Sequence, residues 1–363
     1  MRIEVYSPTI RRKEMDAVLT AMVEEKIGPG DRNRLLIHTA KERLNFDFAL
    51  ALRSPAVALH LALKSLNANP GQAVVISALS PVFYLQVIYD LKLTPLLCDV
   101  TYDNPCMNRE SIENTIAKRN ADIEVCAVIL HHTLGFVPDA ASVAELGIPV
   151  IEDISQSYGY WVKTYEKNEQ ENNITPPGED TGTGGSPLIH GIFCILGLEE
   201  KDMLTSGGGA LLFAMNRRDS AALRNFSGIA DEYCLPDINA ALAVVQFKEV
   251  QRNIERRSEI ARAYIQASLR TRHKRFIQIV KNTENYYSFS LILETGLKDV
   301  IAYARKKEIL LENAFEKTIA GAGLCDNCPV SNSLALRTVL FPMYPRLRSQ
   351  DVEHVSRLIM TLP

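Results

Sequence analysis

Short apolar runs alternate with longer amphipathic stretches over residues 73–151. The runs are apolar without interruption, which is typical of parallel strands covered on both faces. In the stretches between them, apolar residues recur every three or four positions, which predicts helices. This alternation predicts an α/β fold, with a mostly parallel sheet flanked by helices. The predicted strands are 73–77, 95–99, 125–131 and 149–151, and the predicted helices are 82–91, 109–119 and 140–146.

The patterns before and after this region predict two domains. The chain begins with an irregular segment and helices, and it ends in a smaller α+β pattern. We therefore expect a large domain over 1–250 and a small C-terminal α+β domain over 251–363. The other expected helices are 11–22, a second one ending at about 44, 56–66, 236–269 (one helix or a pair), 297–307 and 349–360, and the other strands are 210–214, 286–293 and 340–342.

Residues 162–185 interrupt the large domain with a polar segment rich in glycine and proline. A loop of this length inside a domain is usually a lid, an interaction loop or a disordered insertion. We expect a loop inserted into the sheet domain and leave its role open.

The composition restricts the classes of function. The chain has 363 residues, of which 47% are hydrophobic and 23% charged, and its net charge is -3. An apolar fraction of this size supports a large core. The near-balanced charge gives no electrostatic footprint for nucleic acid or a membrane surface. The N-terminus lacks a signal-peptide layout and no apolar run reaches the ~20 residues that span a bilayer. We therefore expect a cytoplasmic protein that binds neither nucleic acid nor membranes.

Cysteine spacing gives no metal site. Cys325 and Cys328 form a single Cys-x-x-Cys pair among seven cysteines. A pair without further ligands is a weak zinc or redox signal. We expect no metal ion and leave the use of this pair open.

Two acids follow the predicted strand that ends at Ile151. Glu152 and Asp153 lead into a turn that contains Gln156 and Gly159. In an open parallel sheet, ligands bind outside the carboxyl ends of the strands. The acids therefore predict either a ligand site at that edge or simple capping of a following helix.

Four stretches together resemble one family. They are residues 53–59, 150–159 (Val-Ile-Glu-Asp-Ile-Ser-Gln-Ser-Tyr-Gly), 237–247 and 328–345, which ends with Leu-Phe-Pro-Met-Tyr-Pro. In this order and spacing, the chain resembles the DegT/StrS-type sugar aminotransferases, which bind pyridoxal phosphate (PLP) and have the aspartate-aminotransferase fold, fold type I. The resemblance covers almost the whole chain.

The resemblance implies a PLP site, a substrate class and an assembly. Asp153 matches the carboxylate that holds the pyridine nitrogen protonated, and Gln156 matches the residue near the phenolic side of the ring. Ser54, Pro55 and Ala56 match the phosphate-binding helix start, and Cys194 matches a phosphate-binding serine. The implied substrate is a keto sugar, expected to be nucleotide-linked, with glutamate as amino donor, and the implied assembly is a homodimer.

Several positions depart from the family pattern. Pro55-Ala56 replaces Gly-Thr, which removes a hydroxyl and a backbone N–H from the phosphate site. Pro81 aligns with an aromatic residue that stacks on the pyridine, unless Phe83 or Tyr84 takes that place. Glu232 and Cys234 align with the asparagine and arginine that a partner subunit offers.

The Schiff-base lysine is ambiguous. Counted forward from Phe193, its position falls on Glu199, whereas counted back from the glycines at 207–209 it falls on Lys201. A third interpretation is that residues 199–202 form a solvated surface turn, since charge runs are usually exposed.

Two hypotheses therefore stand together. In the first, the chain is a PLP-dependent aminotransferase with Lys201 and Asp153 as its catalytic residues. In the second, it is a degenerate member that has lost PLP chemistry and serves as a ligand-binding, regulatory or structural partner.

Overall fold

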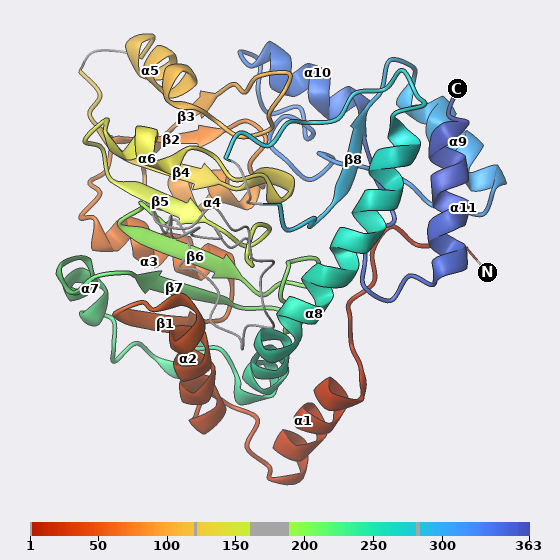
Figure 1. The fold of residues 1–363 in the computed structure, drawn as a ribbon. Helices are drawn as coiled ribbons and strands as arrows, with labels where there is room; N and C mark the ends of the chain where they lie inside the picture. The colour runs from red at the N-terminus through yellow and green to blue at the C-terminus, as the bar shows by residue number, and fades with distance from the viewer. Residues whose placement is uncertain (1, 120–121, 160–188, 281–283) are drawn as a thin grey trace, which may run out of the picture.

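A seven-stranded sheet forms the centre of the molecule (Figure 1). The computed structural model describes residues 2–119, 122–159, 189–280 and 284–363, so the predicted loop at 162–185 lies outside the described residues. The strand order is β1-β7-β6-β5-β4-β2-β3. Strand β7 runs against its two neighbours and the other pairs are parallel, which confirms the predicted mostly parallel sheet. The strands are β1 Phe48–Leu52, β2 Ala73–Ser77, β3 Thr94–Cys98, β4 Val125–His131, β5 Val150–Asp153, β6 Phe193–Gly197 and β7 Ala210–Ala214.

Helices cover both faces of this sheet because successive strand residues point to opposite sides. In β4, Ala127 and Ile129 pack in the core under α3 and α4, while Val128 and Leu130 pack in the core with α5 and α6. The helices of this part are α1 Arg12–Val23, α2 Asp31–Leu44, α3 Pro55–Ser65, α4 Phe83–Asp90, α5 Arg109–Ala117, α6 Ala140–Ala144 and α7 Arg217–Arg224.

A second, smaller sheet lies near the C-terminus. Its order is β8-β10-β9, and both pairs are antiparallel. Its strands are β8 Phe289–Ile292, β9 Glu312–Asn313 and β10 Thr338–Phe341, and the helices are α8 Asp237–Ser268, α9 Leu297–Lys306, α10 Pro329–Arg337 and α11 Ser349–Met360. Helix α8 is one continuous helix that crosses the domain boundary predicted after residue 250 and packs on both α2 and α11. The division into two domains stays a prediction.

Some elements were not predicted from the sequence. They are strands β1 and β9 and helices α7 and α10. The sequence of β1, Phe-Ala-Leu-Ala-Leu, is rich in good helix formers, and its pairing with β7 along five residues overrides that propensity. Helix α10 begins at Pro329, directly after the cysteine pair, in a region assigned to a loop.

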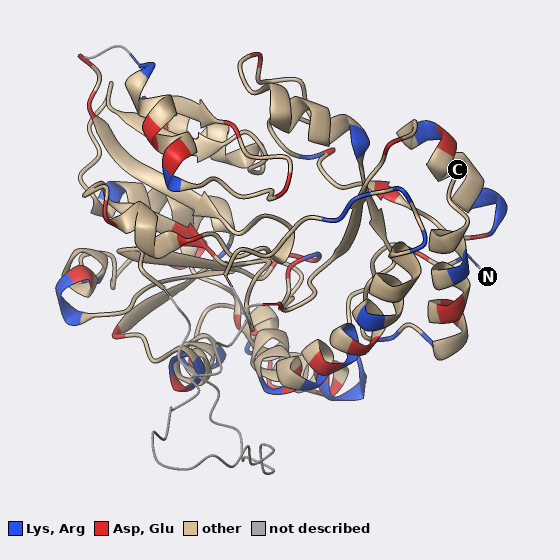
Figure 2. Cartoon of the chain, turned by 45° about the horizontal axis from the view of Figure 1, so that its top comes forward, with Lys and Arg blue, Asp and Glu red and all other residues tan. Residues whose placement is uncertain are grey.

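Charged residues of both signs are interspersed over the helices (Figure 2). In the part of the chain that the structure describes, no helix combines the length and the apolar character that crossing a bilayer requires.

The sheet register brings three strand ends together. His131, at the end of β4, lies opposite Asp153, and Asp153 lies opposite Ile195 of β6. The acids predicted to follow a strand therefore stand at the carboxyl edge of the sheet, where ligands bind in open parallel sheets.

Asp237, at the start of α8, connects this helix to the start of α2. Its carboxylate, 1% exposed, accepts hydrogen bonds from the backbone N–H groups of Gly30, Arg32 and Asn33 at 2.8 to 3.0 Å. Replacing Asp237 with alanine leaves these partly buried donors at the start of α2 without their acceptor. We expect a loss of about 2–4 kcal/mol in the free energy of unfolding.

Urea denaturation followed by circular dichroism measures this loss. The matched control is Asp231→Ala, an exposed acid just upstream, for which we expect a change within about 0.5 kcal/mol. Equal stability of the two variants would contradict the assigned role of Asp237.

Candidate active site

A cavity of about 230 Å³ lies between the carboxyl edge of the large sheet and the small sheet. Its polar lining comes from segments far apart in the chain. The large sheet and its loops contribute His131, Thr133, Gln156, Lys201 and Asp202, and the region of the small sheet contributes Tyr287, Ser288, Glu312, Asn313 and Lys317. Two predicted site residues, Gln156 and Lys201, thus line one cavity.

Asp153 is buried beneath this cavity and is hydrogen-bonded within the chain. Its Oδ2 accepts a hydrogen bond from the Tyr84 hydroxyl at 2.5 Å. Its Oδ1 accepts one from the Ser155 N–H at 3.0 Å and another from the Ser155 hydroxyl. The residue is 3% exposed and Tyr84 is 0% exposed, so these contacts are shielded from solvent. Both oxygens of the carboxylate are therefore engaged by the protein itself.

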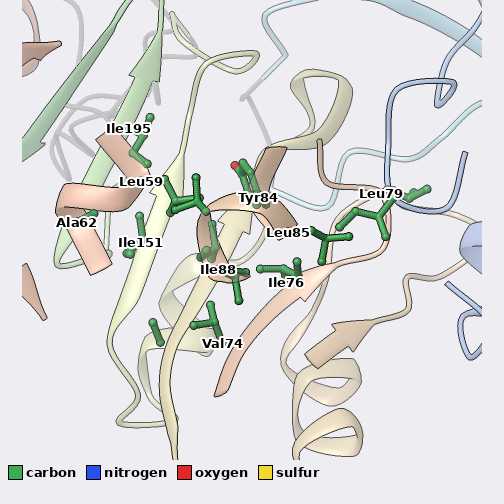
Figure 3. Close-up of a cluster of buried hydrophobic side chains, with 14 of the residues drawn as sticks. Leu59, Ala62, Val74, Ile76, Leu79, Tyr84, Leu85, Ile88, Ile151 and Ile195 are labelled. Atoms are coloured by element: carbon green, nitrogen blue, oxygen red, sulfur yellow. The ribbon is translucent and has the colours of Figure 1, made fainter. Parts of the chain in front are cut away.

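The sequence analysis considered Tyr84 only as a ring that could stack on the pyridine, and not as the hydrogen-bond partner of Asp153. It belongs to α4 and lies among apolar side chains including Leu59 and Ile88, with its hydroxyl at the edge of that cluster (Figure 3). Burial raises the pKa of Tyr84 well above its usual value, and the neighbouring Asp153 raises it further, so the phenol keeps its proton. The available signal was the apolar helix around it, which indicates packing and not a partner for an acid.

Gln156 is held by the backbone of the turn that follows β4. Its Oε1 accepts a hydrogen bond from the Leu134 N–H at 2.7 Å. Leu134 has a left-handed φ of 57° and Gly135 one of 86°. A Cβ at Gly135 would also collide with Asn285 and Tyr287, so this position requires glycine.

The four residues matched to a phosphate site offer few donors. Ser54 is the N-cap of α3, and its Oγ accepts the N–H of Val57 at 3.3 Å while its own O–H can still donate. Pro55 has no N–H, and Ala56 has no hydroxyl. Cys194 is 1% exposed, and burial raises the pKa of its thiol. In the described residues, none of the four lines the cavity.

Lys201 faces the rim of the cavity. Its Nζ lies 2.8 Å from Oε2 of Glu312, and these two side chains are 49% and 44% exposed. The backbone of the same turn is fixed by two tyrosines, since the Tyr6 hydroxyl donates to the carbonyl of Glu200 and the Tyr287 hydroxyl to that of Lys201. The ion pair and the two hydrogen bonds together fix the position of the lysine.

Asp202, and not its neighbours, turns inward. Its Oδ2 accepts the Glu199 N–H at 2.8 Å and lies against Gly197 at the end of β6, beside Ser155. Burial raises the pKa of Asp202 to about 8, and the charge of Asp153 adds to this effect. Glu199 is exposed. The sequence analysis weighed Glu199 against Lys201 and did not consider Asp202, because the acidic run predicted an exposed turn.

A second buried group of polar side chains lies behind the acids. His132 Nε2 is 3.3 Å from Glu152 Oε2, and His132 Nδ1 is 2.7 Å from Ser157 Oγ. Glu152 Oε1 accepts the N–H groups of His190 and Gly191. These side chains are fully buried, so Glu152 joins β4, β5 and the segment before β6 rather than contacting the cavity.

The fold and this edge-of-sheet site define the class of protein as an α/β protein of the aminotransferase type. The chain belongs to the DegT/DnrJ/EryC1/StrS aminotransferase family, whose model matches residues 8–173 and 208–360. The two matched segments leave out residues 174–207, which include Glu199, Lys201 and Asp202.

Individual relatives agree with this assignment. The chain is 28% identical over 274 residues to the candidate pyridoxal phosphate-dependent aminotransferase EpsN of Bacillus subtilis, a match that covers 70% of this chain and 66% of that protein, just under two thirds of its length. The candidate sugar aminotransferase Spr1654 of Streptococcus pneumoniae, in its PLP form, superposes with a TM-score of 0.83 at 16% identity over 99% of this chain and 98% of that one. AtS13 of Actinomadura melliaura gives 0.81 at 20% identity over the same shares.

The residues present do not fit PLP in the position that family membership implies. Asp153 already accepts hydrogen bonds at both oxygens, from Tyr84 and from Ser155. In the first turn of α3, the N–H of Ala56 is the one backbone donor left among the described residues. A phosphate dianion held by few donors loses charge-assisted hydrogen bonds worth a few kcal/mol. No reaction step through PLP is therefore derived for this chain.

Asp202 predicts a pH dependence of stability. Its pKa is raised from 3.8 to about 8 on folding, so the folded chain holds a proton that the unfolded chain releases. The resulting stabilisation is complete below about pH 4 and is lost as the pH rises to about 8. Asp202→Asn removes this dependence. We expect equal melting temperatures of variant and wild type near pH 4, and an advantage of about 2 °C or more for the variant at pH 8.5.

Differential scanning calorimetry across this pH range checks the expectation. The matched control is Glu200→Gln, an exposed acid in the same turn, which should follow the wild type at every pH. A constant difference between Asp202→Asn and wild type would show that Asp202 titrates normally.

Proposed function

We propose that this chain is a degenerate member of the aminotransferase family that binds a small sugar-like ligand and does not carry out PLP-dependent transamination. The observation that carries the proposal is the state of Asp153, whose two oxygens accept hydrogen bonds from Tyr84 and Ser155. The small number of donors at the matched phosphate-site residues and the position of Asp202 also support the proposal. Asp202, and not a lysine, takes the inward position of the turn after β6, beside Ser155.

The cavity supports the ligand class. Its volume of about 230 Å³ is below the range of about 300–1,000 Å³ that accommodates drug-sized molecules. The lining combines apolar side chains such as Leu134 and Phe315 with amide, hydroxyl and carboxyl groups. Such a lining suits one sugar ring, and the substrate class of the family suggests a keto sugar.

The second candidate is a PLP-dependent aminotransferase that acts on a keto sugar, expected to be nucleotide-linked. Lys201 would be the Schiff-base lysine and Asp153 the partner of the pyridine nitrogen. One observation favours it: Lys201 and Gln156 line the same cavity. When bound, PLP would supply an electron sink for the substrate carbon.

The visible absorption of the protein with added PLP separates the two candidates. We expect no band of lysine-bound PLP in the wild type at saturating PLP, because Asp153 is occupied and Lys201 is paired with Glu312. A band in the wild type that Lys201→Ala abolishes and Lys317→Ala retains would establish the second candidate. Lys317 is the matched control, since it is a second lysine that lines the cavity. For the first candidate, we expect isothermal titration calorimetry to detect binding of a keto sugar without turnover.

We also propose a homodimer, as family membership suggests. Helix α1 carries Met15, Leu19, Met22 and Val23 at helical spacing, and each is at least 50% exposed. Contiguous exposed apolar positions mark interaction sites. We expect that charges introduced by the double substitution Leu19→Glu and Met22→Glu convert a wild-type dimer into a monomer.

Size-exclusion chromatography with light scattering measures the mass. Leu336→Glu is the control, because Leu336 is an exposed leucine on α10, far from α1 in the sequence. A monomeric wild type would rule out the dimer, and a dimeric double variant would rule out α1 as its interface.

A further inference from the structure

Tyr84 donates to one of the two Asp153 oxygens to which a pyridine nitrogen could also donate. Its hydroxyl lies 2.5 Å from Oδ2, while the other oxygen of Asp153 faces Ser155. A pyridinium N–H requires the same kind of acceptor at about the same distance, 2.7 to 2.9 Å for a charge-assisted bond. The tyrosine and a cofactor ring therefore compete for one carboxylate.

The packing around Tyr84 also holds its side chain in place. Tyr84 is 0% exposed, and its ring packs edge-on against Phe83 at 4.8 Å and against His131 at 6.1 Å between ring centres. Side chains in a close-packed interior leave no space into which a ring can rotate. Moving Tyr84 would also leave Asp153 without one of its donors until a ligand replaced it.

We propose that Tyr84 is the specificity-determining residue that closes the Asp153 site to a PLP-type pyridine ring. This inference rests on the proposed loss of PLP chemistry and identifies the side chain that causes it. Tyr84 acts in two ways, because its hydroxyl donates to the Asp153 oxygen and its ring packs against His131, which lines the cavity. A ligand in the cavity then meets Gln156, Thr133 and Asp202 instead of Asp153.

The test measures binding of pyridoxamine 5′-phosphate to the full chain by isothermal titration calorimetry. This probe carries the pyridine ring and the phosphate but does not react with surface lysines. Tyr84→Leu removes the hydroxyl and shortens the side chain while keeping an apolar residue in the core. We expect its affinity to exceed that of the wild type at least tenfold, and Tyr84→Phe, which frees the oxygen but keeps the ring, to gain less, about threefold.

Tyr89→Leu is the matched control, since Tyr89 lies on the same helix with 58% exposure. It should bind like the wild type. A folded Tyr84→Leu protein that binds no more tightly than the wild type overturns the proposal. Should that variant fail to fold, Tyr84→Phe carries the test alone, and an unchanged affinity overturns the proposal.

The outcomes separate this inference from the proposed function. Tight binding to the wild type, together with a band of lysine-bound PLP, contradicts the proposed function itself. Weak binding to the wild type without any gain in the Tyr84 variants leaves the proposed function standing and removes Tyr84 as its cause. A gain in Tyr84→Leu supports both.

Discussion

Burying a carboxylate at the end of β5 is the constraint on which the arrangement of this site depends. A buried charge is costly unless it is hydrogen-bonded, and Asp153 is 3% exposed. The chain meets this requirement with its own donors, Tyr84 from α4 and Ser155 from the turn after β5. In an aminotransferase of this family the resemblance assigns one of those contacts to the cofactor. Here the contact is internal, so the folded chain already satisfies the acid without a bound group.

The turn at residues 199–202 also places an acid at the carboxyl edge of the sheet. The turn places Asp202 at the end of β6, while Lys201 reaches Glu312 on β9. Burial raises the pKa of Asp202 to about 8, so this second acid is largely neutral at pH 7 and does not add a full charge beside Asp153. Tyr6 and Tyr287 hold the backbone of the turn through the carbonyls of Glu200 and Lys201. The geometry of the lysine is therefore set by several contacts and not by its own side chain alone.

The sequence predicted the fold more completely than it predicted the arrangement of side chains at the site. Uninterrupted apolar runs predicted strands such as 73–77 and 125–131 with the bounds that the structure has, because buried parallel strands have that pattern. Strand β1 was missed, since its alanines and leucines favour a helix and its pairing with β7 is a tertiary effect. At the site, the order of motifs placed Asp153 and Gln156 at the sheet edge. Counting residues did not reveal which side chain of a four-residue charged turn faces inward, because that depends on the hydrogen bonds of the turn.

Tyr84 shows why a matching motif is weaker evidence than a matching set of contacts. A carboxylate at the end of a strand can accept a hydrogen bond either from a phenol or from a protonated ring nitrogen, since both are donors of suitable geometry. The stretch Glu152-Asp153-Ile154-Ser155-Gln156 is therefore compatible with either partner. What decides between them lies on α4, about 70 residues earlier in the chain, and on the turn after β6. A cofactor assignment for a member of this family rests on those partners, because they determine whether the acid is still available to a ligand.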